Sequence, residues 1–220
     1  MGNPFRPSFD LRIRTCRVEI GMSNHDYLFA LALLTSKGVH DPATMPILYL
    51  WTDEASPQLE RGVMKWGWFH RAAWTSNNWS FNGAVIGDGE MAGVLGLRAT
   101  DFAAIRTVTT GSWLGLEHQG HGIGKEMRTA ILYFAFERLG ALDAHSGAFV
   151  DNESSRQVSR ALGYQDSGRR TVLRRGIKAE LLELRLDRSK WAQREHPAIE
   201  ISGLEGCREF FTAPHSRGAS

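Results

Sequence analysis

Residues 107–140 read TVTTGSWLGL-EHQGHGIG-KEMRTAILYFAFERLG, and this stretch decides the fold. The apolar run 107–116 predicts a strand, 117–124 a glycine-rich turn, and 125–139 a helix that ends at Gly140. The first N–H groups of a helix have no partner inside it, and its dipole places about half a positive charge there. Glycines in the turn carry no Cβ, so a ligand can lie against the backbone. The stretch therefore predicts a phosphate-binding turn.

Two common phosphate-binding motifs do not fit this turn. The dinucleotide motif G-x-G-x-x-G would need glycine at Lys125. The P-loop would need glycine at Gln119 and Ser or Thr at Glu126. What remains is Q-x-x-G-x-G, formed by Gln119, Gly122 and Gly124. Short glycine motifs recur by chance, so a plain strand-to-helix loop stays open as an alternative at this point.

Two motifs carry a resemblance to a known family. The Q-x-x-G-x-G run resembles the (R/Q)-x-x-G-x-(G/A) pyrophosphate motif of the GNAT (Gcn5-related) N-acyltransferases, and 113–122 resembles the W-L-x-x-E-x-Q-G-x-G pattern of the RimJ/RimL-type branch. Residues 152–164 resemble the family's N-x-x-S-x-x-(V/L)-x-x-x-x-G-(F/Y) run. The whole chain is also similar to a mycobacterial protein named as a succinyl-CoA transferase.

The totals are those of an ordinary globular protein. The chain has 220 residues, a net charge of +2 and 42% hydrophobic residues, which favour one domain and give no sign of nucleic-acid binding. Cys16 and Cys207 are far apart, so we expect reduced thiols and no metal site. No signal peptide or membrane-spanning run is visible, and we expect a cytoplasmic protein with no membrane partner. We expect a homodimer or larger homo-oligomer.

The remaining elements follow from periodicity. We expect strands at 11–20, 79–86, 90–97, 141–150, 164–174 and 179–187, and helices at 26–36, from 57 to about 74, and 153–162. Ser23 and Ser56 are candidate helix N-caps, and Pro57 would be the first helical residue of the second helix. The helix 26–36 is apolar nearly all round and should be buried. The stripe that includes Trp66 and His70 is interpreted as core packing.

The order β-α-α-β-β-β-α-β-α-β-β is that of the GNAT fold. We therefore expect an α/β (α+β) protein with a mixed, mostly antiparallel sheet, flanked by helices and splayed at its centre. Residues 1–191 would be a single acyltransferase domain and 192–220 a C-terminal tail.

The resemblance implies an acyl-CoA co-substrate and no permanently bound cofactor. The pantetheine arm would enter between the central strand and the strand near 142–149, and the diphosphate would lie on the turn. The expected CoA-binding residues are Trp113, Leu114, Leu116, Gln119, Gly120, His121, Gly122, Ile123, Gly124, Lys125, Asn152 and Ser155. Asn152 is also a candidate helix N-cap.

The reaction implied is direct attack of an amine on the thioester. A backbone N–H near 114–116 would polarise the carbonyl. Ser159 stands where many family members place a tyrosine that protonates the thiolate; it could donate a hydrogen bond to sulfur or simply pack in its helix. Asp101, His118 and His145 are candidate general bases.

Three questions stay open in the sequence. The acyl group could be succinyl or acetyl, and a succinyl carboxylate would need partners such as His40 or Arg98. The acceptor could be a small-molecule amine or a protein amine. The alternative to an enzyme is a non-catalytic acyl-CoA-binding regulator on the same fold.

Overall fold

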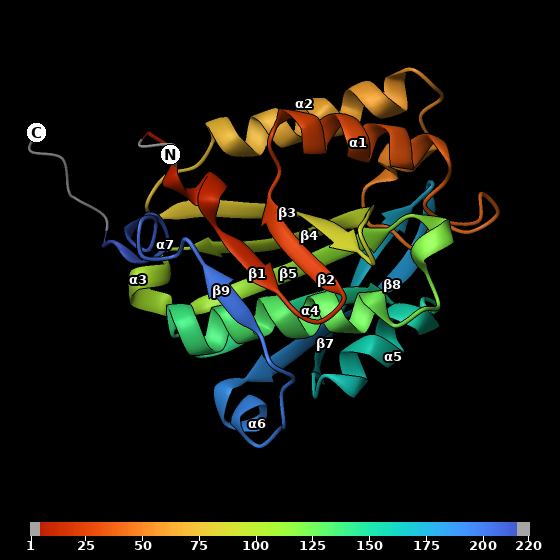
Figure 1. Cartoon of the computed structure of the whole chain (residues 1–220). Helices are drawn as coiled ribbons and strands as arrows, with labels where there is room; N and C mark the ends of the chain where they lie inside the picture. Colours follow the sequence, from red (N-terminus) through yellow and green to blue (C-terminus); the bar gives the residue numbers. More distant parts are fainter. Residues whose placement is uncertain (1–4, 215–220) are drawn as a thin grey trace, which may run out of the picture.

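A nine-stranded sheet organises the protein in a computed structural model that describes residues 5–214 (Figure 1). The strand order is β7-β8-β6-β5-β4-β3-β2-β1-β9, and all neighbours are antiparallel except β5 and β6. The strands are β1 Arg12–Arg14, β2 Val18–Met22, β3 Asn78–Gly87, β4 Glu90–Thr100, β5 Thr107–Leu114, β6 Asp143–Phe149, β7 Gln165–Arg174, β8 Ile177–Asp187 and β9 Glu200–Ser202.

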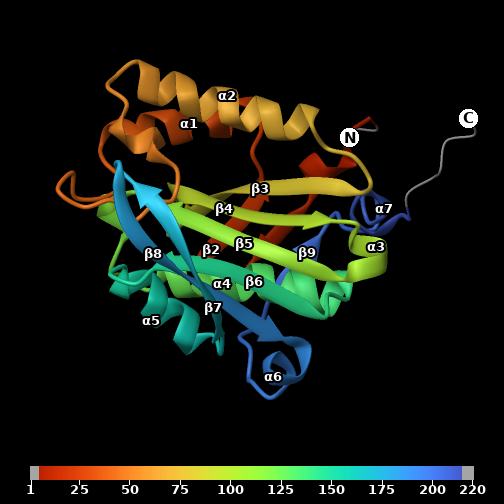
Figure 2. The ribbon, with the colours of Figure 1, turned by 180° about the vertical axis from the view of Figure 1, so that it is seen from behind.

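Helices cover both faces of this sheet (Figures 1 and 2). One face carries α1 (His25–Ser36) and α2 (Gln58–Ala72); the other carries α4 (Ile123–Tyr133), which continues as π-helical turns over Phe134–Leu139, and α5 (Glu153–Ala161). Short helices complete the chain: α3 Phe102–Ile105, α6 Arg188–Ala192, α7 Glu209–Thr212 and 3-10 turns at Pro7–Asp10, Leu50–Asp53 and Leu116–His118. The predicted fold class is confirmed.

Each face has its own apolar core. The larger core lies under α4 and includes Phe81, Phe134 and Trp191, all fully buried. The smaller core lies under α1 and α2 and includes Leu28, Val63 and Val94. Successive side chains of a strand point to opposite faces of the sheet. The alternation therefore decides which side chains pack into the larger core and which into the smaller one.

The sheet splays between β5 and β6, as the resemblance to the GNAT family implies. Their parallel pairing covers only Thr107↔Asp143, Val108↔Ala144 and Thr109↔His145, although β5 continues to Leu114 and β6 to Phe149. The unpaired half of β5 runs toward the turn that starts α4. An opening at the centre of the sheet therefore leads to a helix N-terminus.

Several local expectations are wrong. The strand expected over 11–20 is a hairpin, because the chain turns at Thr15, whose N–H donates to the Val18 carbonyl at 2.9 Å. The cap of α1 is Asn24, whose side chain accepts from the Tyr27 N–H at 2.8 Å; Ser23 instead donates to the Asn82 carbonyl. The helix is not buried all round, since outward-facing apolar residues remain exposed (Phe29, Leu33).

The second helix also differs from its prediction. Ser56 makes no capping hydrogen bond and Pro57 precedes the helix. The interpretation of the Trp/His stripe as core is wrong for Trp66, which is 37% exposed, while Val63 is buried. Helical spacing places the residues of this stripe close together on α2. The elements that pack against α2 cover only part of the stripe, so the rest of it is exposed.

The segment after residue 192 joins the same sheet. β9 pairs with β1, and Phe211 from α7 is fully buried against Trp79 and Phe134. The ring of Trp79 also donates to the Phe211 carbonyl at 3.0 Å. The end of the chain therefore contributes to the larger core.

Candidate functional site

The turn between β5 and α4 is shaped by its own backbone and by one amide side chain. Gly120 and Gly122 have φ values of +79° and +85°, which favour glycine, and a Cβ added at Gly120 would meet nothing within 4 Å. Gln119 Nε2 donates to the carbonyls of Val39 and Leu114, at 2.7 and 2.8 Å. The Gln119 side chain thus holds the turn in shape, and the backbone around the glycines lies open.

Helix α4 begins directly at this turn. Ile123 and Gly124 lie in its first turn, where N–H groups have no helical acceptor, and Lys125 is exposed beside them. His121 is also exposed, and its carbonyl accepts from Arg17 Nη1 at 3.1 Å. The turn and the helix end together offer backbone donors and a positive dipole to an anion.

Sequence reasoning missed Arg17 at this site. Its guanidinium pairs with Asp88 at 2.7 Å, and its backbone N–H donates to Glu126 Oε1 at 3.2 Å. The ion pair with Asp88 raises the pKa of Arg17 and lowers the pKa of that carboxyl. Arg17 comes from the β1–β2 hairpin, so only the folded sheet brings it to the α4 turn.

A buried guanidinium lies below the splay. Arg128 of α4 is 5% exposed and donates to Ser159 Oγ and Ser146 Oγ, each at 3.1 Å. It also lies over the ring of Tyr164, 5.5 Å from the ring centre. The Tyr164 hydroxyl is within 3.1 Å of Thr110 Oγ1, and burial raises the pKa of this tyrosine. These contacts join α4, α5 and both splayed strands through polar side chains.

Ser159 is placed in this buried network. Its hydroxyl accepts from Arg128 and donates to the Ser155 carbonyl at 2.9 Å. A hydroxyl has one proton to donate, so in this arrangement the Ser159 proton is already used inside α5.

Asn152 is the N-cap of α5. Its Oδ1 accepts from the Ser155 N–H at 3.1 Å, and its Nδ2 donates to the Pro46 carbonyl at 3.3 Å. The residue therefore ties the loop before α2 to the start of α5.

The residues near the end of β5 are only partly accessible to a bound ligand. Trp113 packs on Trp51 with ring centres 5.6 Å apart, Leu114 is buried and Leu116 is 45% exposed. The expectation of a free N–H near 114–116 is wrong for two of the three residues: Gly115 donates to the Ala92 carbonyl and Leu116 to the Gly38 carbonyl, at 2.9 and 3.1 Å.

The three candidate bases lie in different places. His145 is opposite Thr109, at the last pair before the splay. Asp101 follows the end of β4 as the N-cap residue of α3, at the opposite end of β5 from the turn. His118 is buried within the turn, 3.6 Å from Glu117. β5 is eight residues long, so roughly 23 Å separates its two ends, and His118 cannot share one reacting centre with Asp101.

Comparison with known proteins agrees with this geometry. Residues 30–165, more than half of the chain, match the family described as the acetyltransferase (GNAT) domain. The chain belongs to the GNAT acetyltransferase family. Acyl-CoA is the co-substrate of GNAT acetyltransferases, and membership supports acyl transfer from coenzyme A.

Solved structures share the fold at low sequence identity. A crystal structure described as a probable acetyltransferase matches with TM-score 0.64 and 20% identity, covering 80% of this chain and 96% of that one. RimL, a ribosomal L7/L12 α-N-protein acetyltransferase in complex with coenzyme A, matches with TM-score 0.63 and 17% identity over 79% and 95%. A ribosomal-protein-S5-alanine acetyltransferase from Vibrio fischeri matches with TM-score 0.63 and 15% identity over 82% and 98%.

Across residues 5–214, no group of three or more metal-ligating side chains is assembled, and no helix is both long and apolar enough to cross a membrane.

Proposed function

We propose that this GNAT protein transfers an acyl group from coenzyme A to an amine by direct attack on the thioester. The observation that carries the proposal is the splay, because β5–β6 pairing stops at Thr109 and the opening leads to the α4 turn. The diphosphate would bind the backbone of 120–124 with Lys125 beside it. The pantetheine would run along the unpaired half of β5, near Trp113, Leu114 and Leu116, with Asn152 and Ser155 on the α5 side.

In this reaction the amine nitrogen forms a bond to the thioester carbonyl carbon, the carbon–sulfur bond breaks with its electron pair leaving on the coenzyme A thiolate, and the amine proton passes to a base. His145 is the proposed base, because its place at the mouth of the splay is nearest to the path described. Asp101 is the second candidate. His145→Gln is expected to lower kcat about 10²- to 10⁴-fold, the usual contribution of a general base, whereas Asp101→Asn is expected to leave kcat close to that of the wild type.

The diphosphate site can be tested with a matched pair of glycines. Gly120 and Gly176 have φ values of +79° and +76°, and a Cβ at either meets nothing within 4 Å, so a substitution strains both backbones alike. Gly176 lies in the β7–β8 turn, outside the β5–α4 turn. Gly120→Asp should abolish measurable CoA binding in calorimetry, because it adds an anion at the diphosphate, while Gly176→Asp should bind as the wild type does. Equal binding by both variants would refute the site.

The acyl group is proposed to be succinyl, with acetyl as the alternative. The acceptor would be a small-molecule or protein amine; RimL acts on a ribosomal protein, which makes protein N-termini a first group to test. Release of free thiol from succinyl-CoA and acetyl-CoA, measured with amines and N-terminal peptides, identifies both substrates.

A non-catalytic acyl-CoA-binding role is the second candidate function. The observation in its favour is Ser159, whose proton is donated to the Ser155 carbonyl and not offered to a departing thiolate. Tight binding of acyl-CoA without thiol release across the whole acceptor panel would favour this role. Turnover with any acceptor would exclude it.

A further inference from the structure

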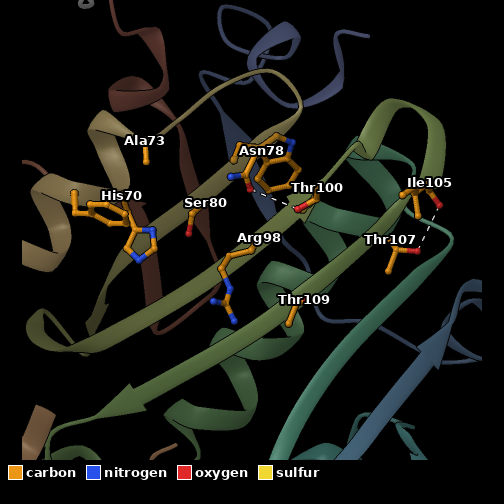
Figure 3. A pocket seen from close by; sticks show the side chains of 12 residues that line it. His70, Ala73, Asn78, Ser80, Arg98, Thr100, Ile105, Thr107 and Thr109 are labelled. Carbon is orange, nitrogen blue, oxygen red and sulfur yellow. Dashed lines mark hydrogen bonds between the residues drawn. The ribbon is translucent and has the colours of Figure 1, made fainter. Parts of the chain in front are cut away.

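A cavity of about 560 Å³ lies on the α2 face of the sheet, at the end of β5 away from the turn. Residues of α2, β3, β4, α3 and β5 line it: Phe69, His70, Ala73, Asn78, Trp79, Ser80, Arg98, Ala99, Thr100, Ile105, Thr107 and Thr109. Figure 3 shows the side chains of His70, Ser80, Arg98 and Thr109 gathered around the same space.

Sheet register aligns polar residues across this cavity. Ser80 pairs with Arg98, Arg98 with Thr109, and Thr109 with His145. Paired residues of neighbouring strands project to the same face of a sheet. The row therefore connects the cavity to the last β5–β6 pair, where the splay opens.

Arg98, which is an exposed residue, carries the positive charge of this cavity. None of its lining residues is acidic, and within residues 5–214 no carboxylate forms an ion pair with Arg98. Burial, together with the nearby Arg98, lowers the pKa of His70, which favours the neutral imidazole. The Arg98 side chain thus presents five unpaired donors beside neutral polar groups.

A strip without side chains leads from the splay to Arg98. Gly96 and Gly111 face each other across β4 and β5, two residues from the Arg98–Thr109 pair. A Cβ at Gly111 would meet nothing within 4 Å, and Gly111 and Ser112 are exposed. Glycine inside a strand is typical of a close approach by a ligand. Two residues correspond to about 7 Å along a strand, a distance that a short acyl chain or a small acceptor spans together with the arginine side chain.

We infer that this cavity is a carboxylate subsite, in which Arg98 binds a carboxylate of one of the two substrates while the reacting carbonyl lies over the Gly96–Gly111 pair. This inference rests on the proposed function. Arginine binds carboxylates through two parallel N–H···O bonds, which fixes orientation as well as charge. The carboxylate can come from the far end of the acyl chain, as in succinyl-CoA, or from the acceptor, as in an amino acid.

Pairs of substrates that differ only in this carboxylate distinguish whether the acyl chain or the acceptor supplies it. Arg98→Gln removes the charge, and Arg98→Lys keeps it without the two-pronged geometry. Arg138→Gln is the matched control, since Arg138 is an exposed arginine on the α4 side of the molecule. Calorimetry compares binding of CoA, acetyl-CoA and succinyl-CoA; kinetics compare amino acids with their amides as acceptors. Thermal unfolding checks that each variant is folded.

Should the acyl chain supply the carboxylate, Arg98→Gln should weaken succinyl-CoA binding about 10- to 100-fold and leave acetyl-CoA and CoA unchanged. Should the acceptor supply it, the same variant should lower kcat/KM for amino acids by a similar factor and leave their amides unchanged. In either case the affinity or kcat/KM of Arg98→Lys should lie between that of the wild type and that of Arg98→Gln. Arg138→Gln should match the wild type.

If Arg98→Gln still binds CoA and prefers succinyl-CoA over acetyl-CoA, and amino acids over their amides, to the same degree as the wild type, the subsite is overturned. The proposed function would stay intact. A wild-type protein that binds no CoA would instead overturn the proposed function and this inference with it.

Discussion

Filling the glycine strip should stabilise the protein and impair its function at the same time. Gly111 lies inside β5 with no atom within 4 Å of the position a Cβ would occupy, and its φ is not in the left-handed region. A Cβ at Gly111 therefore meets no atom, and Gly111→Val adds two further methyl groups at this exposed position. Glycine in a strand interior costs roughly 0.5–1 kcal/mol relative to alanine, and valine favours strands further.

We expect Gly111→Val to raise the free energy of unfolding by about 0.5–1 kcal/mol. For a chain of 220 residues this corresponds to a Tm increase of roughly 1–4 °C in a calorimetric scan. The same methyl groups would occupy the space proposed for the thioester. Binding of acyl-CoA in isothermal calorimetry should fall at least 10-fold, while Gly111→Ala should show a smaller loss.

The control is Thr171→Val in the exposed edge strand β7, which adds apolar area to a strand far from the splay. It should leave acyl-CoA binding unchanged. The reasoning is refuted if Gly111→Val is folded and stable yet binds acyl-CoA as tightly as the wild type. A large drop in Tm would refute the claim that the space over Gly111 is open.

Three further predictions concern stability and reactivity. Phe211→Ala should lower the free energy of unfolding by about 3–5 kcal/mol in urea titration, because Phe211 is fully buried. The neighbouring residue Phe210 is 36% exposed, so Phe210→Ala should lower the free energy of unfolding far less. Burial raises the pKa of Cys207 to about 11, so a thiol reagent at pH 8 should modify exposed Cys16 and reach Cys207 only on unfolding; mass spectrometry of a native sample that shows Cys207 labelled would contradict this. Asn152→Ala should cost about 1 kcal/mol through loss of the α5 cap, and Asn152→Asp should keep the capping acceptor but lose the bond to the Pro46 carbonyl, so its Tm in thermal unfolding should lie between those of the alanine variant and the wild type.

Much of the candidate site is local in origin, which is why the sequence predicts it. Gly120 and Gly122 adopt positive φ values because glycine alone does so without strain, and the helix they precede starts within two residues of its predicted position. Asn152 likewise caps α5 through atoms only three residues away. Such features depend on backbone sterics and short-range hydrogen bonds.

Side-chain exposure could not be predicted in the same way. Phe29 and Leu33 are as apolar as buried Leu28 and Leu31, yet they are 56% and 51% exposed because nothing in residues 5–214 covers that face of α1. The same limit applies to Trp66 on α2. Periodicity tells which residues share a helix face, and only the packing of other elements tells whether that face is covered.

By itself, the sequence determined the strand, turn and helix around residues 107–140, the alternation of Leu182, Leu184 and Leu186, and the order of elements from 79 to 187. Only the tertiary structure decided that Arg17 reaches the turn, that Ser159 gives its proton to its own helix, and that β9 completes the sheet. It also brought Arg98 into line with His145 across three strands. The first group follows from interactions within a few residues; the second depends on strand register and chain crossings that connect residues far apart in the sequence.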